Sequence, residues 1–400
     1  MENIKVYIRI RKKENSIENY NINIIDEKQI ILDNNNFNFD KIYRNNIDQK
    51  DFYKETCNDS INLLLQGFNI TIFAYGSTGS GKTFTIFGNN NNQGITHFSI
   101  NEIFENISKN NIEYSIKCSF LEIYKEKIID LLNVVSENLK IRNNDKGIFV
   151  ENLVEKNINN QEDIVNIINE GVKQRTVNQT SLNTNSSRSH SILSISIKQI
   201  LNDKSELFSK LNIIDLAGSE NINKSEVQGL ALSETKSINK SLSCLKNVII
   251  ALENKNDHIP YRESKLTRLL QDQIGGNSKL IVISTINPYT ESYHETLNTL
   301  KFSKSIKNIK NIVKPNRYET KEYLLNLINI LKEQNNNLYN DNSIKTDLYN
   351  LIDKISLLNL KINKMQDIIN HYELFIDIFM KNRQKDIDIL KDIDVLKSKI

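Results

Sequence analysis

The sequence contains few of the residues that break or cross-link a chain. Of 400 residues, 12 are Gly, 3 are Pro and 3 are Cys, and Trp is absent, whereas average usage would supply about 28 Gly. The cysteines are too few and too scattered for a disulfide framework or a zinc site, and the five His do not cluster with Cys or carboxylates at metal-ligand spacing. A reducing, intracellular compartment is therefore expected.

Long apolar runs and a strong charge imbalance are also lacking. No run approaches the roughly 18 apolar residues of a spanning helix, and the N-terminal MENIKVYIRIRKKE alternates like a strand and lacks the apolar block of a signal peptide. The net charge of +3 means that a polyanionic partner must bind a local basic patch. We expect no membrane span and no nucleic-acid partner.

The residues that are abundant indicate a compositional bias. The chain has 61 Asn and 42 Lys but only 10 Arg, and the codons of Asn, Lys and Ile are A/T-rich. A Gly or Arg retained against this bias is therefore more informative than usual. With 38% hydrophobic and 25% charged residues, the chain can build a core, and its length predicts two or three domains or one large one.

From residue 1 to about 315, short apolar runs alternate with amphipathic stretches. The apolar runs lie at 4–10, 70–76, 114–124, 191–200, 210–218 and 279–286, and several of them are continuously apolar, as in strands covered on both faces. Helices are predicted at 59–68, 162–175 and 236–254. This order predicts an α/β fold with a central, mostly parallel to mixed sheet flanked by helices. The Asn runs at 34–36 and 89–92 are expected to be surface loop insertions.

After Pro315 there is no further Gly or Pro, and apolar residues follow heptads. With Leu348 at position a, thirteen of the sixteen a and d positions are apolar. The pattern predicts a coiled coil over 343–400, or else a long helix folded back on the globular part. Residues 320–334 form an earlier helical segment, and the Asn-rich stretch 335–342 separates the two.

Residues 76–83, GSTGSGKT, fit the phosphate-loop pattern Gly-x4-Gly-Lys-Ser/Thr and follow an apolar run. The glycines let backbone amides curl around phosphate oxygens, Lys82 neutralises β/γ charge, and Thr83 offers a hydroxyl to Mg²⁺. We therefore predict a nucleotide site formed by Gly76, Ser77, Thr78, Gly79, Ser80, Gly81, Lys82 and Thr83.

Two further motifs fit the same site. Asp215 closes the run KLNIIDLAG, where a carboxylate can hold the Mg²⁺ water shell and Gly218 can offer its amide to the γ-phosphate. An isolated D-x-x-G can be a simple turn, but the upstream phosphate loop favours the functional interpretation. Residues 185–190, NSSRSH, suit a γ-phosphate sensor, although alone they could be a polar loop.

Together these motifs resemble a kinesin motor domain. FAYGSTGSGKT (73–83), NSSRSHS (185–191), DLAGSE (215–220), SINKSL (237–242) and YRESKLTRLLQD (261–272) occur in the order and at the spacing of that family. The resemblance covers residues 3–315; myosins and GTPases share the phosphate loop but lack YRESKLTRLL. It implies a P-loop NTPase fold of the kinesin motor type, with ATP and Mg²⁺ as cofactors. It also implies microtubule-stimulated ATP hydrolysis and plus-end-directed movement.

The resemblance also implies roles for individual residues. Lys82 and the amides of residues 79–83 hold the phosphates, and Ser187 joins Thr83 and Asp215 near Mg²⁺. Ser186 places the attacking water, and Arg188 pairs with Glu220 as a salt bridge across the site. The remaining implied contacts flank the adenine and come from Arg9, Arg11 and Phe84.

For the basic stretch around YRESKLTRLL the resemblance implies a face that binds acidic tubulin, although such charge runs are usually solvated. Its candidate residues are Lys236, Lys240, His258, Arg262, Lys265 and Arg268. The implied domains are a motor at 1–303, a neck linker at 304–316, a neck helix with the Asn-rich break at 317–342, and a coiled coil at 343–400 that supports a homodimer. The linker is mildly similar to the centromere-associated, kinetochore-type subfamily, so the expected location is cytoplasmic microtubules, the spindle among them.

Two rival functions remain open from the sequence. One is a non-processive kinesin that regulates microtubule ends without stepping. The other is a microtubule-binding scaffold with weak ATPase activity. The intact phosphate loop and DLAGSE motif disfavour the scaffold, and the predicted coiled coil disfavours the non-processive regulator.

Overall fold

The computed structural model describes residues 2–11, 22–44, 47–89, 91–109, 113–133, 135, 139–144, 147–181, 188–220, 230–338 and 353–366. The chain divides into two compact units. The first comprises residues 1–201 and 206–318, and the second comprises 202–205 and 319–400.

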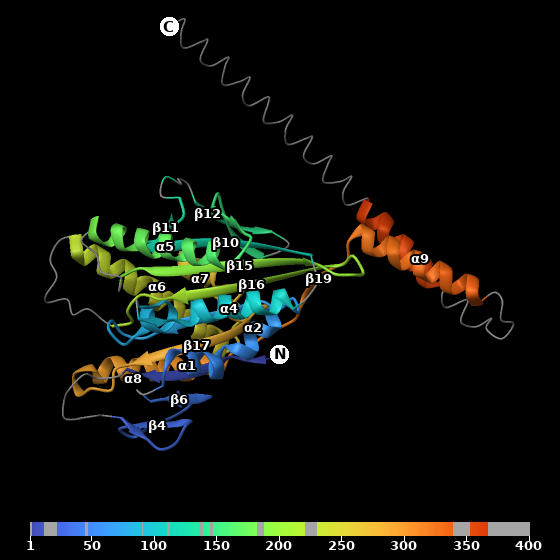
Figure 1. Ribbon diagram of the computed structural model, residues 1–400. Coiled ribbons are helices and arrows are strands. Elements are labelled where there is room, and N and C mark those ends of the chain that lie inside the picture. The colour runs from blue at the N-terminus through green and yellow to red at the C-terminus, as the bar shows by residue number, and fades with distance from the viewer. Residues whose placement is uncertain are drawn as a thin grey trace, which may run out of the picture. The chain divides into compact units, whose positions relative to one another are not determined.

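A twisted central sheet organises the first unit (Figure 1). Within the described residues its strand order is β11-β10-β15-β16-β7-β17-β2-β6, with β14 added to β10 and β19 to β16. Neighbours from β16 through β6 pair in parallel, whereas β11, β10, β15 and β16 pair antiparallel. The sheet is mixed, as the sequence predicts. Its strands are β2 Lys5–Ile10, β6 Lys41–Tyr43, β7 Ile70–Tyr75, β10 Glu113–Tyr124, β11 Lys127–Asp130, β14 Lys156–Ile158, β15 His190–Ile200, β16 Glu206–Asp215, β17 Lys279–Ile286 and β19 Asn316–Tyr318.

Helices cover both faces of this sheet. The alternation of side chains along β7 shows why: Ile72 packs into one hydrophobic core and Phe73 into the other. The core around Ile72 contains helices α1 Gln49–Thr56, α2 Asn58–Leu64, α4 Ile95–Ser108 and α5 Gln161–Ser181. The core around Phe73 contains α6 Leu230–Glu253, α7 Lys265–Leu269 and α8 Tyr293–Lys307. The continuously apolar runs are therefore strands buried on both faces.

Short elements complete the first unit. The helical ones are α3 Lys82–Ile86 and the 3-10 turns η2 Tyr261–Glu263 and η3 Thr290–Ser292. The small strands are β1 Glu2–Asn3, β3 Asn23–Ile24, β4 Gln29–Leu32, β5 Asn35–Asn38, β8 Gly88–Asn89, β9 Asn92–Gln93, β12 Lys140–Asn144, β13 Gly147–Glu151 and β18 Lys310–Asn311.

The Asn runs are not simple loop insertions. Residues 35 and 36 belong to β5, whose Phe37 is buried, and the second run contributes to the β8–β9 hairpin. Burial of a single aromatic side chain is enough to hold the first run in a strand, although Asn has a low strand propensity.

The predicted neck linker begins inside a helix. Helix α8 continues to Lys307, past the expected boundary at 303, because Ile306 is fully buried against the core. After it, β18 pairs with β1 and β19 pairs with β16, so residues 310–311 and 316–318 lie as short strands on the first unit.

The second unit contains helix α9 Lys321–Leu338 and a helix over residues 353–366. Thr320 begins α9, since its Oγ1 accepts from Tyr323 N at 3.0 Å and donates to Lys204 O at 2.6 Å. Helix α9 runs into the expected Asn-rich break at 335. Along 353–366 the heptad positions Ile355, Leu358 and Ile362 are half-buried, whereas the heptad position Met365 and the other residues of this helix are exposed. The rest of the predicted coiled coil lies outside the described residues.

A membrane-spanning helix is also not found among these elements. Across the described ranges, every helix is too short or too polar to cross a bilayer.

Candidate functional site

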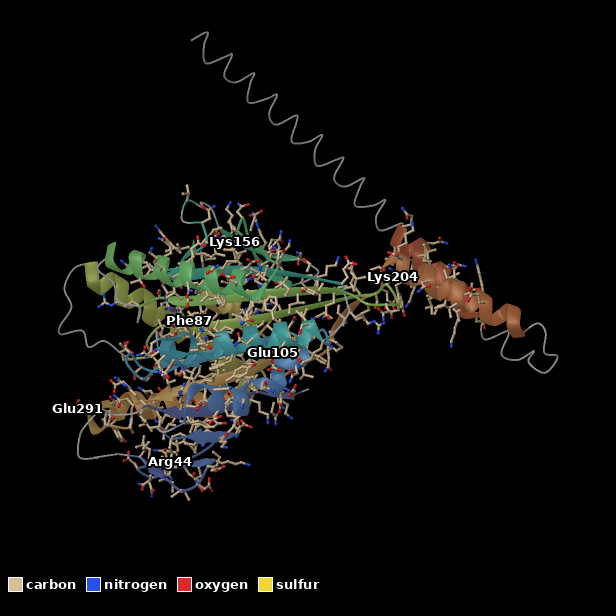
Figure 2. The ribbon with its side chains drawn as sticks, viewed as in Figure 1. Arg44, Phe87, Glu105, Lys156, Lys204 and Glu291 are labelled. Carbon is tan, nitrogen blue, oxygen red and sulfur yellow. The ribbon has the colours of Figure 1, made fainter. Side chains whose placement is uncertain are left out.

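The phosphate loop joins β7 to α3, at the carboxyl end of a central parallel strand. A Cβ on Gly76 would overlap the Thr285 carbonyl oxygen of β17, and Gly81 has a φ of 107°. Both positions therefore require glycine. Phe87, labelled in Figure 2, is the C-cap of α3, and its ring packs against Phe120 of β10 with centroids 5.8 Å apart. The loop is thus anchored at both ends.

Lys82 lies inside this loop. Its Nζ donates to the carbonyl oxygens of Gly76 at 2.9 Å and Ser77 at 2.8 Å, and only 6% of the residue is exposed. Burial lowers the pKa of the ammonium, and the carboxylates of Asp215 and Glu220 oppose that shift. The loop therefore holds a cation at its centre, where phosphate oxygens would bind.

Thr83 and Asp215 form the second part of the site, as the motifs predict. Thr83 Oγ1 donates to Asp215 Oδ2 at 2.8 Å, and Asp215 is 1% exposed. The other carboxylate oxygen, Oδ1, is buried and has no hydrogen-bond partner within the described residues. A buried carboxylate oxygen without a donor is costly unless a cation or a bound water meets it. The pair fits Mg²⁺, which prefers hydroxyl, carboxylate and water oxygens.

Arg175 of α5 is a site residue that the motifs did not reveal. Its Nη1 donates to Asp215 Oδ2 at 2.8 Å and its Nε lies 3.6 Å from Glu122 Oε1, with all three side chains at most 5% exposed. Ser189 Oγ donates to the same Glu122 oxygen at 2.5 Å. One signal was available in the sequence, because Arg175 is among the ten arginines kept against the compositional bias.

The segment after β16 closes onto the phosphate loop. Ser219 N donates to Gly76 O at 3.0 Å, and Glu220 accepts from Thr78 N at 2.7 Å and from the Thr78 hydroxyl. A Cβ on Gly218 would contact Thr78 and Glu220, so the backbone at Gly218 lies directly against the loop. Glu220 thus binds Thr78 in this structure, and its ion pair with Arg188 stays a prediction. Ser186 and Ser187 lie outside the described residues.

The expected adenine contacts lie together beside the loop. The Arg9 guanidinium stacks over the rings of Phe52 at 4.5 Å and Phe84 at 5.5 Å, and burial lowers its pKa to about 10. Arg9 also donates to Gln49 Oε1 at 2.5 Å and to Thr85 Oγ1 at 3.0 Å. Arg11 donates to the carbonyl oxygen of Gly79. Phe84 is 37% exposed, which leaves its ring available for stacking.

Supporting contacts around Arg9 were not predicted. Gln49 accepts from Arg9 and donates through Nε2 to Phe84 O at 2.6 Å, so it joins the two predicted residues. Only the folded chain brings α1 next to β2, and no local pattern at residue 49 signals this contact.

The predicted basic face is built from α6, η2 and α7. Ser264 begins α7 with a capping box that includes Thr267, and Tyr261 OH donates to Ile274 O at 2.5 Å. The basic candidates on this face are exposed or half-buried: Lys240, His258 and Arg262 are exposed, and Lys265 and Arg268 are half-buried. The side chain of Lys236 lies outside the described residues. The described basic side chains thus lie on α6, η2 and the capped helix α7, with His258 in the loop between α6 and η2.

Comparison with known proteins agrees with this geometry. Residues 4–309 match the kinesin motor domain family. Kinesin-related protein 5 of Dictyostelium discoideum is 43% identical over 352 residues, which are 83% of this chain and 35% of that protein. The kinesin heavy chain of Drosophila melanogaster is 39% identical over 336 residues, 80% of this chain and 34% of that protein. The chain spans about a third of the length of these relatives.

A solved structure of a fast kinesin has the same fold. It superimposes with a TM-score of 0.75 at 35% sequence identity, over 80% of this chain and 96% of that chain. The family match over residues 4–309 contains the phosphate loop, the 215–220 segment and helices α6 and α7. The chain therefore belongs to the kinesin motor domain family.

Proposed function

We propose that this chain hydrolyses ATP, that microtubules stimulate the reaction, and that hydrolysis drives movement along them. Kinesin motor domains are microtubule-stimulated ATPases that bind ATP with Mg²⁺. The observation that carries the proposal for this chain is the closure of the 215–220 segment onto the phosphate loop. Thr83 binds Asp215 and Thr78 binds Glu220, so the elements that sense phosphate lie within hydrogen-bond reach of the elements that hold it.

Each residue of the site has its own proposed role in phosphoryl transfer. Thr83, Asp215 and Ser187 would hold Mg²⁺, which neutralises charge on the phosphate oxygens when bound. Lys82 and the amides of residues 79–83 bind the phosphates. Gly218 contacts the γ-phosphate, Ser186 places the attacking water, and Arg188 with Glu220 orders that water. Positioning and charge stabilisation of this kind are sufficient without a strong general base.

The nucleotide binds beside Arg9, Arg11 and Phe84 in this proposal. The guanidinium groups and the half-exposed ring offer one stacking face and donors at the edge of the loop. The phosphate cradle itself comes from Gly76, Ser77, Thr78, Gly79, Ser80, Gly81, Lys82 and Thr83.

The basic face is the proposed track face, and it consists of Lys236, Lys240, His258, Arg262, Lys265 and Arg268. Exposed and half-buried basic side chains around the capped helix α7 suit a polyanionic surface such as tubulin, and their attraction should weaken as salt is added. The kinesin relatives support microtubules of the cytoskeleton as the partner.

In this proposal the neck linker and the heptad region convert ATP hydrolysis into movement. Residues 310–311 and 316–318 pair with β1 and β16, which supports a linker that docks along the motor and favours plus-end movement. The heptads after residue 343 support a homodimer. A motor that acts at microtubule ends without stepping is the second candidate, since it would use the same site.

Steady-state phosphate release by the chain, with and without microtubules, tests this function. We expect turnover to rise with microtubule concentration to a plateau, and to depend on Mg²⁺. Turnover without any microtubule dependence would contradict the proposal, and no turnover under either condition would favour a scaffold.

A further inference from the structure

The buried imidazole of His190 joins the nucleotide site to the track face. His190 opens β15, directly after the NSSRS stretch, and its backbone is fixed by pairing with Ile123 of β10. Its Nδ1 accepts from Ala217 N at 3.0 Å, and its Nε2 lies 2.8 Å from Ser241 Oγ on α6. The ring, carried by β15, thus contacts both the 215–220 segment and helix α6.

The hydrogen-bond partners of His190 determine the tautomer and the protonation state of its ring. A backbone N–H can only donate, so Nδ1 must carry the lone pair. The hydrogen of the neutral ring then resides on Nε2 and is donated to Ser241. Burial and the nearby cations Arg175 and Lys82 lower the pKa of His190 to about 3, which keeps the ring neutral. Protonation of Nδ1 would place two N–H donors opposite each other and break the hydrogen bond from Ala217 N.

The two ends of the link lie next to residues with proposed roles. Ala217 precedes Gly218, the proposed γ-phosphate contact, and Ser241 follows Lys240, a proposed tubulin contact. Ser241 is 3% exposed whereas Lys240 is exposed, so α6 presents one residue inward and its neighbour outward. The closely packed interior around His190 cannot absorb a shift of Ala217 without moving a neighbour.

We propose that His190 is a positioning residue that couples the 215–220 segment to helix α6, by accepting from Ala217 and donating to Ser241. The inference rests on the proposed function. When the 215–220 segment moves, the ring turns on its fixed backbone and carries Ser241 with it. Binding of a track at α6 acts back on the 215–220 segment by the same route, because coupling is reciprocal.

Two variants break the α6 half of the link and keep the Ala217 half. Ser241→Ala removes the acceptor on α6. His190→Asn places an amide oxygen near the Nδ1 position, where it can still accept from Ala217, but it does not reach Ser241. Ser194→Ala is the matched control, because Ser194 lies on the same strand, is 7% exposed and donates to Asn212 Oδ1 at 2.7 Å, away from α6.

The measurement is the ratio of ATP turnover at saturating microtubules to basal turnover. We expect Ser241→Ala and His190→Asn to lower this ratio by about tenfold, the effect of one lost buried hydrogen bond, with basal turnover within about twofold of the parent. The double variant should lose no more than either single one. His190→Gln, whose amide nitrogen reaches the Nε2 position but which has no acceptor at the Nδ1 position, breaks the Ala217 half and should lower the ratio to a similar extent.

Two results would overturn the inference. One is a ratio in Ser241→Ala equal to that of the parent, and the other is an equal loss in Ser194→Ala. A parent chain that microtubules do not stimulate at all would instead contradict the proposed function, so the two failures are distinguishable.

Discussion

Arg175 and Asp215 form a buried ion pair, with Nη1 and Oδ2 separated by 2.8 Å and at most 5% of either side chain exposed. Asp215 is also the acceptor for Thr83, so one carboxylate connects α5 to the phosphate loop. Glu122 lies 3.6 Å from the same guanidinium. A single guanidinium thus lies next to two buried carboxylates at the proposed Mg²⁺ site.

Removing this guanidinium should destabilise the fold. Arg175→Met leaves Asp215 and Glu122 buried without their cation, and we expect the free energy of unfolding to fall by about 3–5 kcal/mol. Urea denaturation measures the change. Arg142→Met is the control, because its ion pair with Glu151 is about half exposed and should be worth at most about 1 kcal/mol. Equal decreases in the free energy of unfolding of the two variants would contradict the prediction that the buried Arg175 pair matters more than an exposed pair.

Lys82 should determine nucleotide affinity more than stability. Lys82→Met removes the buried cation from the centre of the loop, and we expect kcat/KM for ATP to fall by at least about 100-fold. Binding of a fluorescent ATP analogue and phosphate release measure the loss. Lys198→Met is the control, because it breaks only an outlying ion pair with Glu206; it should leave kcat/KM for ATP and the affinity for the ATP analogue unchanged. Near-parental ATP turnover in Lys82→Met would rule out the assigned role.

The lowered pKa of His190 predicts an acid-sensitive fold. Above about pH 6.5 the ring is neutral in both the folded and the unfolded chain. Between that pH and about 3, the unfolded chain binds a proton that the folded chain excludes. The free energy of unfolding should therefore decrease by up to about 1.4 kcal/mol per pH unit as the pH falls through this window. Denaturation at several pH values should show a shallower decrease in His190→Gln; an identical slope would contradict the assignment.

The basic face should act through its charge. Reversal of Arg262 and Lys265 to Glu should raise the microtubule concentration needed for half-maximal turnover by about tenfold or more, since like charges now face acidic tubulin. Basal turnover should not change. Lys54→Glu, an exposed reversal on α1 at the other face of the sheet, is the control. The idea fails if the double reversal and the control need the same microtubule concentration.

The residues that the sequence revealed are those that lie close together in the chain. The phosphate loop and Asp215 follow apolar runs, and β7 and β16 place them side by side as neighbouring strands. Arg175, Gln49 and His190 were missed as site residues because each acts across the fold. Helix α5 must pack beside β10, and α1 beside β2, before Arg175 meets Asp215 or Gln49 meets Arg9. No local periodicity encodes such tertiary contacts.

Element boundaries were predicted less well for a related reason. Helix α8 continues past residue 303 because Ile306 is buried in the core. Strand β5 includes two residues of an Asn run because the next residue, Phe37, is buried. In both places burial of one apolar side chain outweighs the local preference of its polar neighbours.

Gliding of polarity-marked microtubules over the surface-attached chain tests the central claim most directly. The proposed mechanism predicts ATP-dependent gliding with the minus ends leading, as for a plus-end motor. Glu220→Ala should stop it, because the bonds from Thr78 that close the 215–220 segment are lost. Microtubules that bind without gliding on the parent chain, or gliding that persists in Glu220→Ala, would contradict the account.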